Sequence, residues 1–484
     1  MIKRFIKDTG IYGLSNILSK GISIILVPFY TRVLTPDDYG IIDILAVFYA
    51  IVAVTVPLEI TQAVAIFLSD DNYSENGDRY TNNKIIVSST AFFLTLFCFS
   101  FFLILSLIFS GPVALILLDD NSKVNIYQVA SIHMFLTGLF YFVQNQLRWL
   151  LRPVKVAIVS ITYTILSIAL TIYFILISNF GVIGVFWAYV ISAFIGFILG
   201  FYYSRDCYKF VFSFRKLKDM LKFSYPLVPS SVGVFFLNYT QRIIIKGIMT
   251  LGDLGLFGIA SRLSSFINLA FQSIQGALIP LIYQRYKEKT TPESLRKMFN
   301  YLSFILFSCF IAISFFAKEI MILLTTPVFY SAYILVPFLF ISEIFEGMKS
   351  FAVGLAIKKK TKTIALINLI GGTFTVGLSF LLIYLWGLLG AAIAISIKSI
   401  SLFILQMIYS QKEYHVSYDF KKIVIACILA IVLIFVVYIS GSIKYIQFIK
   451  VVVIILYILS LIYFLKLVSF SEMRVFLINR LKKR

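Results

Sequence analysis

Long runs of apolar residues, separated by short polar segments, fill almost the whole sequence. A helix that crosses the hydrocarbon core of a bilayer needs roughly 20 apolar residues, and about fourteen runs meet that criterion. The runs lie near residues 12–34, 41–64, 84–109, 125–146, 155–178, 181–203, 222–247, 254–281, 300–324, 332–356, 362–384, 387–410, 422–440 and 446–467. The pattern predicts an all-α integral membrane protein with about fourteen transmembrane helices.

The Lys and Arg residues gather on alternate loops between these runs. Of the 43 basic residues, six fall on the opposite set of loops and five fall inside apolar runs. The six are Arg32, Lys123, Lys246, Lys318, Lys444 and Lys450, and the five are Lys20, Arg242, Arg262, Lys349 and Lys398. Because basic flanks resist translocation, the rich side is expected to face the cytoplasm. An even number of spans then puts both ends of the chain in the cytoplasm.

Composition agrees with a membrane protein. The 484 residues are 60% hydrophobic and 13% charged, whereas soluble domains average about 45–50% apolar and about 25% charged residues. The net charge of +21 reflects this topology rather than nucleic-acid binding, because the basic residues are dispersed over many loops. The four cysteines and two histidines have no metal-binding spacing, so neither a metal nor a cofactor is expected. His133 is interpreted as a core histidine rather than a proton relay.

The two halves of the sequence share short motifs in the same order. Val33–Gly40 (VLTPDDYG) resembles Ile248–Gly255 (IMTLGDLG), which ends 215 residues later, and Asn179–Gly184 (NFGVIG) resembles Leu385–Gly390 (LWGLLG), which ends 206 residues later. Six apolar runs separate equivalent positions, so the repeats run parallel, as in transporters built from two related bundles. The predicted domains are an N-lobe (1–204), a basic cytoplasmic linker (205–221), a C-lobe (222–411), and a segment with the last two spans and a basic tail (412–484).

Three of these stretches resemble a known family. The segment TRVLTPDDYG resembles the first outer-loop signature (T-R-x-L-x-P-x-x-Y-G) of Wzx-type polysaccharide flippases, which belong to the multidrug/oligosaccharidyl-lipid/polysaccharide (MOP) superfamily. The matching residues are Thr31, Arg32, Leu34, Pro36, Tyr39 and Gly40. Leu385–Ala394 is similar to the family's G-x-x-G-A-A turn, and Tyr225–Pro229 to its entrance to span 7. The sequence departs from the family at Gln241, where an Asp often precedes the Arg; Arg242 is therefore expected to be less neutralised here.

The resemblance covers essentially the whole chain and implies a V-shaped transporter of two six-helix bundles followed by two further helices. It implies that undecaprenyl-pyrophosphate-linked oligosaccharide is flipped from the inner to the outer leaflet of a bacterial plasma (inner) membrane by alternating access. The product would serve surface polysaccharide such as O-antigen or capsule. The protein is not expected to be an enzyme. Its expected partners are the lipid-linked glycan and membrane lipids, with the polysaccharide polymerase and chain-length machinery as further candidates.

Polar side chains inside the apolar runs are candidates for a substrate cavity. A charge at mid-bilayer costs roughly 2.5–3.5 kcal/mol, so such residues usually face water or a partner. Cations from spans 1, 7 and 8 are expected to ring a cavity between the lobes, where Arg offers paired donors to a pyrophosphate. The alternative is a polar helix–helix seam with snorkelling cations. The candidates are Asn16, Ser19, Lys20, Arg242, Arg262, Asn268 and Gln272.

Three acidic residues inside the runs are candidates for ion coupling. Glu59 is expected to share a face of the second span with Thr55 and Gln62, and Pro57 is expected to bend that span. Glu343 and Glu346 lie on one side of the tenth span, and Glu346 is three residues before Lys349. Because that spacing brings two side chains together on a helix, Glu346 and Lys349 are expected to neutralise each other. A structural ion pair is the alternative interpretation for Glu59 as well.

Two other functions remain open at this stage. An ion-coupled multidrug antiporter of the same superfamily would need an acidic cavity, whereas the unpaired charges here are mostly basic. A membrane polysaccharide polymerase or ligase would be expected to carry a large outer loop with catalytic residues, and no gap between the runs exceeds about 20 residues, too few for a separate folded domain.

Overall fold

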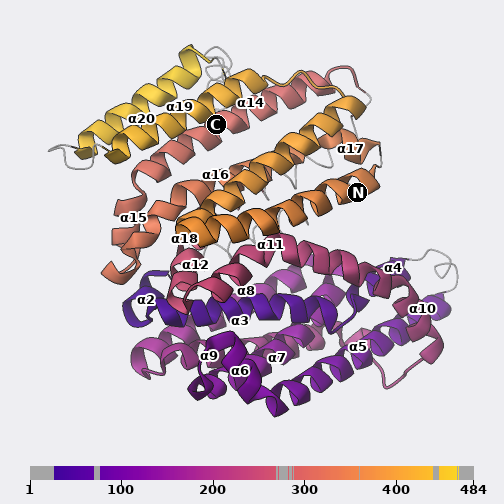
Figure 1. Ribbon diagram of the computed structural model, residues 1–484. Coiled ribbons are helices and arrows are strands. Elements are labelled where there is room, and N and C mark those ends of the chain that lie inside the picture. Colours follow the sequence, from indigo (N-terminus) through magenta and orange to yellow (C-terminus); the bar gives the residue numbers. More distant parts are fainter. Residues whose placement is uncertain are drawn as a thin grey trace, which may run out of the picture. The chain divides into compact units, whose positions relative to one another are not determined.

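A computed structural model shows that the elements are helical throughout its described residues (Figure 1). These residues are 27–69, 77–268, 271, 282, 286, 288–358, 360–439, 446–465 and 467. The predicted all-α fold is therefore confirmed. Three candidates on the first span (Asn16, Ser19 and Lys20) and Gln272 on the eighth lie outside the described residues.

The chain divides into two compact units, Met1–Ile259 and Ala260–Arg484. The first contains α2 (Val27–Val33), α3 (Pro36–Thr55), α4 (Ile60–Ser69), α5 (Gly77–Ile108), α6 (Ser110–Leu118), η2 (Asn121–Lys123), α7 (Val124–Trp149), α8 (Pro153–Ile172), η3 (Tyr173–Ile177), α9 (Gly181–Ser204), η4 (Arg205–Cys207), α10 (Phe214–Ser224), η5 (Tyr225–Leu227), α11 (Val228–Ile248) and most of α12 (Leu251–Ser264). The second contains α14 (Thr291–Phe315), α15 (Ala317–Leu324), η6 (Pro327–Leu335), α16 (Val336–Met348), η7 (Lys349–Phe351), α17 (Val353–Ile357), α18 (Thr361–Glu413), α19 (Phe420–Ile439) and α20 (Ile446–Tyr463).

Within the described residues, nine helical stretches are long and apolar enough to cross a membrane. The last of them, Lys362–Glu413, is interrupted at Gly387, whose φ of 56° and ψ of −135° are not helical. Two helices therefore meet there, next to the short turn that the sequence places at Leu385 and Trp386. The protein is a multi-pass membrane protein, and the count of fourteen spans remains a prediction.

The second predicted span is not one helix. α3 ends at Thr55 and α4 begins at Ile60, with Pro57 in the turn between them. Leu58 and Glu59 have positive φ angles of 50° and 54°. A proline inside a helix removes a backbone donor and clashes with the preceding turn, which explains the break.

α7 is the central helix of the first unit. It packs against α9, α8 and α5, and Figure 1 shows it among these helices. α11 packs against α3 and so belongs to this unit. The boundary between the two compact units, at Ile259, thus differs from the boundary that the sequence predicted, at the linker 205–221. The predicted boundary follows the sequence repeat, whereas the observed one follows the contacts between helices.

The predicted basic linker contains a helix that packs on the first unit. The backbone N–H of Lys209 donates to Ser89 Oγ at 2.9 Å, and that of Ser213 to Thr90 Oγ1 at 3.1 Å. These bonds hold the segment before α10 against α5. α10 then buries Met220 completely, in a cluster with residues of α4, α5 and α7.

An aromatic core holds the second unit together. α14 lies beside α19 and α20 (Figure 1), and α16 packs on α18. Phe299, Phe307, Phe310, Phe340 and Phe351 are almost fully buried between these helices. Burying such large side chains is the main stabilising contribution available where two helices meet.

Candidate functional site

Two helices begin with the same capping box, one in each repeat. Before α3, the backbone N–H and the hydroxyl of Thr35 donate to Asp38 Oδ2 at 3.0 and 2.9 Å, and the N–H of Asp38 donates back to Thr35 Oγ1 at 3.2 Å. Before α12, Thr250 and Asp253 make the same three bonds at 3.2, 2.7 and 3.1 Å. Such reciprocal bonds satisfy donors that a helix N-terminus leaves open. The structure thus confirms the predicted correspondence between these motifs.

Two glycines of the same motifs bring α3 and α12 into backbone contact. A Cβ on Gly40 would lie 1.8 Å from the carbonyl oxygen of Leu251, and a Cβ on Gly255 would lie 2.0 Å from that of Pro36. Gly40 and Gly255 are equivalent in the repeat, as are Pro36 and Leu251, so the contact is reciprocal. Only glycine leaves room for backbones this close. The contact lies at the helix ends that the basic-residue pattern assigns to the outside.

The other residues of the family signature are mostly structural. Thr31 is buried and donates its hydroxyl to the Val27 carbonyl at 2.9 Å. Tyr39 is fully buried and meets Tyr30 edge to face, with ring centroids 6.0 Å apart. Leu34 is also buried, and only Arg32 points to the surface. The motif therefore builds the start of α3 rather than a binding surface.

Arg242 forms an ion pair that the sequence analysis missed. Its Nε donates to Asp43 Oδ2 at 2.7 Å, and Asp43 is only 8% exposed. The guanidinium also lies over the ring of Phe257, 5.6 Å from its centroid. In the second repeat Gly258 replaces Asp43, and a Cβ there would lie 3.1 Å from the Asp43 carboxylate carbon. The expectation that Arg242 is poorly neutralised because Gln241 replaces an Asp is wrong.

The signal for this pair was present in the sequence. Asp43 lies inside the second apolar run, where a carboxylate needs a partner. The family pattern places the acid at residue 241, directly before the arginine. In this protein the acid is Asp43, which lies on another helix and 199 residues away in the sequence. The local pattern therefore identified the cation but not its partner.

In the second unit, a residue expected to bind substrate contacts a residue expected to couple transport to an ion. The side-chain amide of Asn268, expected in the cavity, donates to Glu343 Oε2 at 2.6 Å. Glu343 was expected to take part in ion coupling. Arg262 lies half-buried in the last turn of α12 and interacts with other groups of the protein.

The surroundings of Glu346 and Glu59 decide whether each expectation for these two residues holds. Glu346 and Lys349 form the predicted ion pair. Glu59 does not share the face of a continuous helix with Thr55, because it lies in the turn after Pro57. That part of the expectation is wrong, since the proline ends α3 before Glu59 is reached.

Of the six basic residues on the predicted outer side, the structure describes all but Lys444, and three of these five have acidic partners. Lys246 bonds both carboxylate oxygens of Asp119, at 2.5 and 2.6 Å. Lys450 bonds Glu319 Oε1 at 2.5 Å. The Lys123 ammonium lies 4.0 Å from the carboxylate of Asp120. The acidic partners Asp119, Asp120 and Glu319 offset the charge of these three lysines.

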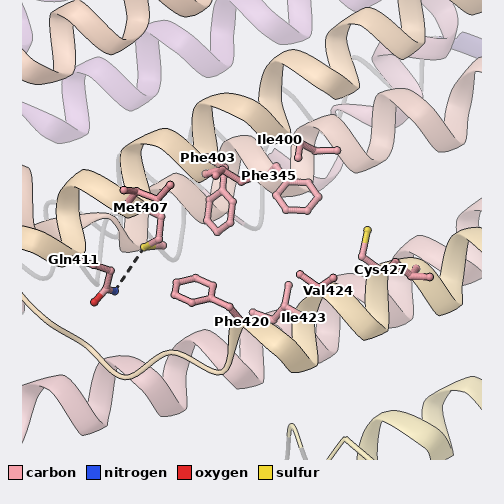
Figure 2. Close-up of a pocket in the computed structure, with 12 residues that line it drawn as sticks. Phe345, Ile400, Phe403, Met407, Gln411, Phe420, Ile423, Val424 and Cys427 are labelled. Atoms are coloured by element: carbon pink, nitrogen blue, oxygen red, sulfur yellow. Dashed lines mark hydrogen bonds between the residues drawn. The ribbon is translucent and has the colours of Figure 1, made fainter.

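The second unit also holds an apolar pocket of about 620 Å³ (Figure 2). α16, α18 and α19 supply its walls, and Gln411 lies at one end, where its amide contacts Met407 Sδ at 3.9 Å. The lining residues are Phe345, Ile400, Phe403, Ile404, Met407, Ile408, Gln411, Phe420, Ile423, Val424, Cys427 and Ile428. Sequence reasoning missed this pocket, because its apolar residues look like lipid-facing ones.

Comparison with known proteins places the chain in a family. Residues 29–334 match the model of the family "Polysaccharide biosynthesis protein". The succinoglycan biosynthesis transport protein ExoT of Rhizobium meliloti (strain 1021) is 22% identical over 294 residues, which cover 59% of this chain and 55% of that protein. The chain therefore spans about half the length of this curated relative.

Solved structures show the same fold. The lipid II flippase MurJ, in an inward closed conformation, matches with a TM-score of 0.69 and 15% identity, covering 94% of this chain and 98% of that chain. An inward-facing multidrug resistance MATE family transporter of the MOP superfamily matches with a TM-score of 0.63 and 18% identity, covering 82% and 93%. The chain belongs to the polysaccharide biosynthesis protein family and has the fold of the MOP-superfamily transporters.

Proposed function

We propose that this protein flips undecaprenyl-pyrophosphate-linked oligosaccharide repeat units from the inner to the outer leaflet of a bacterial plasma membrane. The exported units would supply a surface polysaccharide, and both ends of the chain would lie in the cytoplasm. Family membership and the likeness to a succinoglycan transport protein support this substrate class. The polysaccharide polymerase and chain-length machinery are the proposed partners.

The observation that carries the mechanism is the reciprocal contact of Gly40 and Gly255. Alternating access needs a seal that forms on one side of the membrane and opens again. At the two glycines the backbones themselves meet, so no side chain stands between the helix ends at this point and none has to leave when they separate. In our proposal the outer ends of α3 and α12 are closed against each other here and part when the substrate leaves.

The cationic candidates would bind the pyrophosphate. Arg242 is fixed by Asp43 through Nε; among the described residues its two Nη groups make no hydrogen bond that competes with an anion. A guanidinium held this way presents a preorganised pair of donors. Lys20 and Arg262 complete the proposed cationic set, with Asn16, Ser19, Asn268 and Gln272 as polar neighbours.

The lipid tail needs an apolar surface, and the pocket of the second unit offers one. A volume of about 620 Å³ falls in the range of roughly 300–1,000 Å³ that is usual for ligand pockets. Its walls are almost entirely aliphatic, aromatic or sulfur-containing. We propose that part of the polyprenyl chain occupies it while the head group crosses.

The proposal is tested by deleting the gene in the native host. Surface polysaccharide should be lost, and intact lipid-linked repeat units should accumulate on the inner leaflet. Restoration by the wild-type gene is the control. Normal surface glycan together with new sensitivity to cationic drugs would favour the alternative, a multidrug antiporter, for which Glu59, Glu343 and Glu346 would be the first coupling candidates.

A further inference from the structure

Five polar aromatic side chains converge inside the first unit from four helices. We call them the tyrosine–histidine cluster: Tyr49 of α3, His133 and Tyr141 of α7, Tyr163 of α8 and Tyr189 of α9. The His133 ring lies 5.3 Å from that of Tyr189 and 6.1 Å from that of Tyr49, measured between centroids. The hydroxyl of Tyr49 lies within electrostatic range of those of Tyr163 and Tyr141, and Tyr163 within range of Tyr189.

Partial exposure distinguishes this cluster from the packed core. Tyr49, His133, Tyr163 and Tyr189 are half-buried and Tyr141 is 47% exposed. The neighbouring Phe140, Phe142 and Phe186 are all less than 9% exposed. The cluster therefore forms a surface lined by aromatic rings, and His133, interpreted from the sequence as a core histidine, lies on this surface. Phe140 packs behind it against Tyr163, and Phe186 against His133.

The polar atoms of the cluster keep most of their hydrogen-bonding capacity. Tyr189 shares a hydrogen bond with Tyr30, hydroxyl to hydroxyl, at 3.3 Å. Among the residues described here, the hydroxyls of Tyr49, Tyr141 and Tyr163 and the ring nitrogens of His133 make no hydrogen bond to the protein. A hydroxyl can both donate and accept, so these groups are available to a polar ligand or to water.

The cluster faces away from the surface that suits lipid. Ile165 is 54% exposed and lies two residues after Tyr163, which turns it by about 200° around α8. Ile198 is 49% exposed and lies nine residues after Tyr189, about 180° around α9. Exposed apolar side chains suit lipid, whereas polar groups within a span usually face the bundle interior or a wet cavity. One face of α8 and of α9 is therefore suited to lipid, and the opposite face, which carries the cluster, is suited to a polar interior.

Two members of the cluster, Tyr189 and His133, lie deep in the membrane. Tyr189 is eight residues after the start of α9 at Gly181, and His133 is nine after the start of α7 at Val124. At 1.5 Å per residue these positions are roughly 12–14 Å along the helices, near the middle of a hydrocarbon core about 30 Å thick. Polar groups at this depth lie on the route of any hydrated cargo.

We propose that the tyrosine–histidine cluster binds the sugar rings of the transported oligosaccharide. The inference rests on the proposed function and assigns the glycan a site distinct from the cationic residues that would hold the pyrophosphate. Aromatic rings pack against the C–H faces of a sugar, and the hydroxyl and imidazole groups bond its hydroxyls. None of the five side chains is a carboxylate, Lys or Arg, so the sugars recognised are neutral ones.

Binding measurements on the full chain test this assignment. The protein is purified into nanodiscs and titrated with two probes, the host's own lipid-linked oligosaccharide extracted from its membranes and undecaprenyl pyrophosphate without sugar. Tyr163→Leu and Tyr49→Leu should each weaken binding of the glycan-bearing probe by about tenfold, because each removes a ring contact and a hydrogen bond. Binding of the sugar-free probe should not change. Tyr163→Phe, which keeps the ring, should fall between Tyr163→Leu and wild type.

Tyr202→Leu is the matched control. Tyr202 lies on α9, 54% exposed and about 220° around the helix from Tyr189, so its removal should affect neither probe. Equal weakening of both probes in the cluster variants, or weakening of neither, would overturn the assignment. Failure of the proposed function has a different signature: the wild-type protein itself would bind neither probe, or deletion would leave surface glycan intact.

Discussion

At the scale of single residues, most charged side chains named above inside the apolar runs have a polar or charged partner. Asp43 holds Arg242, Glu346 holds Lys349, and Asn268 donates to Glu343. Each pairing offsets part of the cost of a polar group in a low-dielectric setting. The same pairings limit which charges remain to meet a substrate.

Replacing Asp43 should destabilise the protein more than any exposed carboxylate does. Asp43→Asn leaves the Arg242 charge without its partner, at a cost of about 3 kcal/mol. Thermal unfolding in detergent measures this. Asp119→Asn is the control: Asp119 pairs with Lys246 but its side chain is 59% exposed, and such pairs contribute at most about 1 kcal/mol.

A double variant tests whether the Asp43 effect comes from the pair. Asp43→Asn with Arg242→Gln should be less destabilised than the sum of the two single variants, since neither buried charge is then left alone. Simple additivity would show that the two side chains act independently, contrary to the geometry.

Asp419 should make stability depend on pH. Burial raises its pKa, but hydrogen bonds from Asn300 and Arg296 outweigh that effect, so the pKa lies below its usual 3.8. Because the pKa of Asp419 is lower in the folded than in the unfolded protein, its ionised carboxylate stabilises the fold at any pH above the pKa of the unfolded state. This stabilisation is lost as the pH falls toward and through the pKa of the folded state. The unfolding temperature of wild type should therefore drop more between about pH 5 and pH 3 than that of Asp419→Asn. Parallel curves would contradict this.

At the scale of elements, contact between α3 and α12 is set by two glycines. A methyl group on Gly40 would meet the Leu251 carbonyl, so Gly40→Ala should push the helix ends apart. Leu254 is fully buried in α12. In a background without the native cysteines, Leu254→Cys should react faster with a membrane-impermeant thiol reagent added outside when Gly40→Ala is present.

Gly247→Ala is the matched control, because a Cβ at Gly247 would meet nothing within 4 Å. It should leave the labelling rate of Leu254→Cys unchanged. Equal rates in all three backgrounds would mean that the glycine contact does not close this end of the helices.

The pocket beside α18 and α19 gives a second prediction for elements. Ile404 lines it and is 47% exposed. Ile404→Trp should fill part of the volume and reduce the surface glycan restored to the deletion strain, at unchanged protein level. Val432→Trp on α19, outside the pocket and originally 50% exposed, should restore glycan fully. Equal restoration by both variants would remove the pocket from the transport path.

At the scale of the whole molecule, the charge of the cargo should couple flipping to the membrane potential. Moving one negative charge out of an inside-negative cell gains about 2.3 kcal/mol per 100 mV. Collapsing the potential with valinomycin and external potassium should slow export of lipid-linked oligosaccharide. Collapsing only the proton gradient with nigericin should have a smaller effect; the opposite order would favour proton coupling through an acidic residue.

Much of this architecture could be predicted from the sequence. Apolar runs predicted the helices, because hydrophobic length acts locally. The orientation inferred from the alternating basic loops stays a prediction. The Thr35 and Thr250 motifs predicted the repeat, which reappears as two identical capping boxes. A bend at Pro57 was expected for the same local reason, yet its effect on the position of Glu59 was missed because the apolar run continues past the proline.

The sequence by itself determined which segments are helices, which residues cap them and which polar groups lie inside apolar runs. Only the tertiary structure decided which of those groups meet: Asp43 with Arg242, Asn268 with Glu343, and five polar aromatics in one cluster. The physical reason is range. Hydropathy and helix caps depend on neighbours a few residues away, whereas an ion pair across 199 residues exists only because two helices pack side by side.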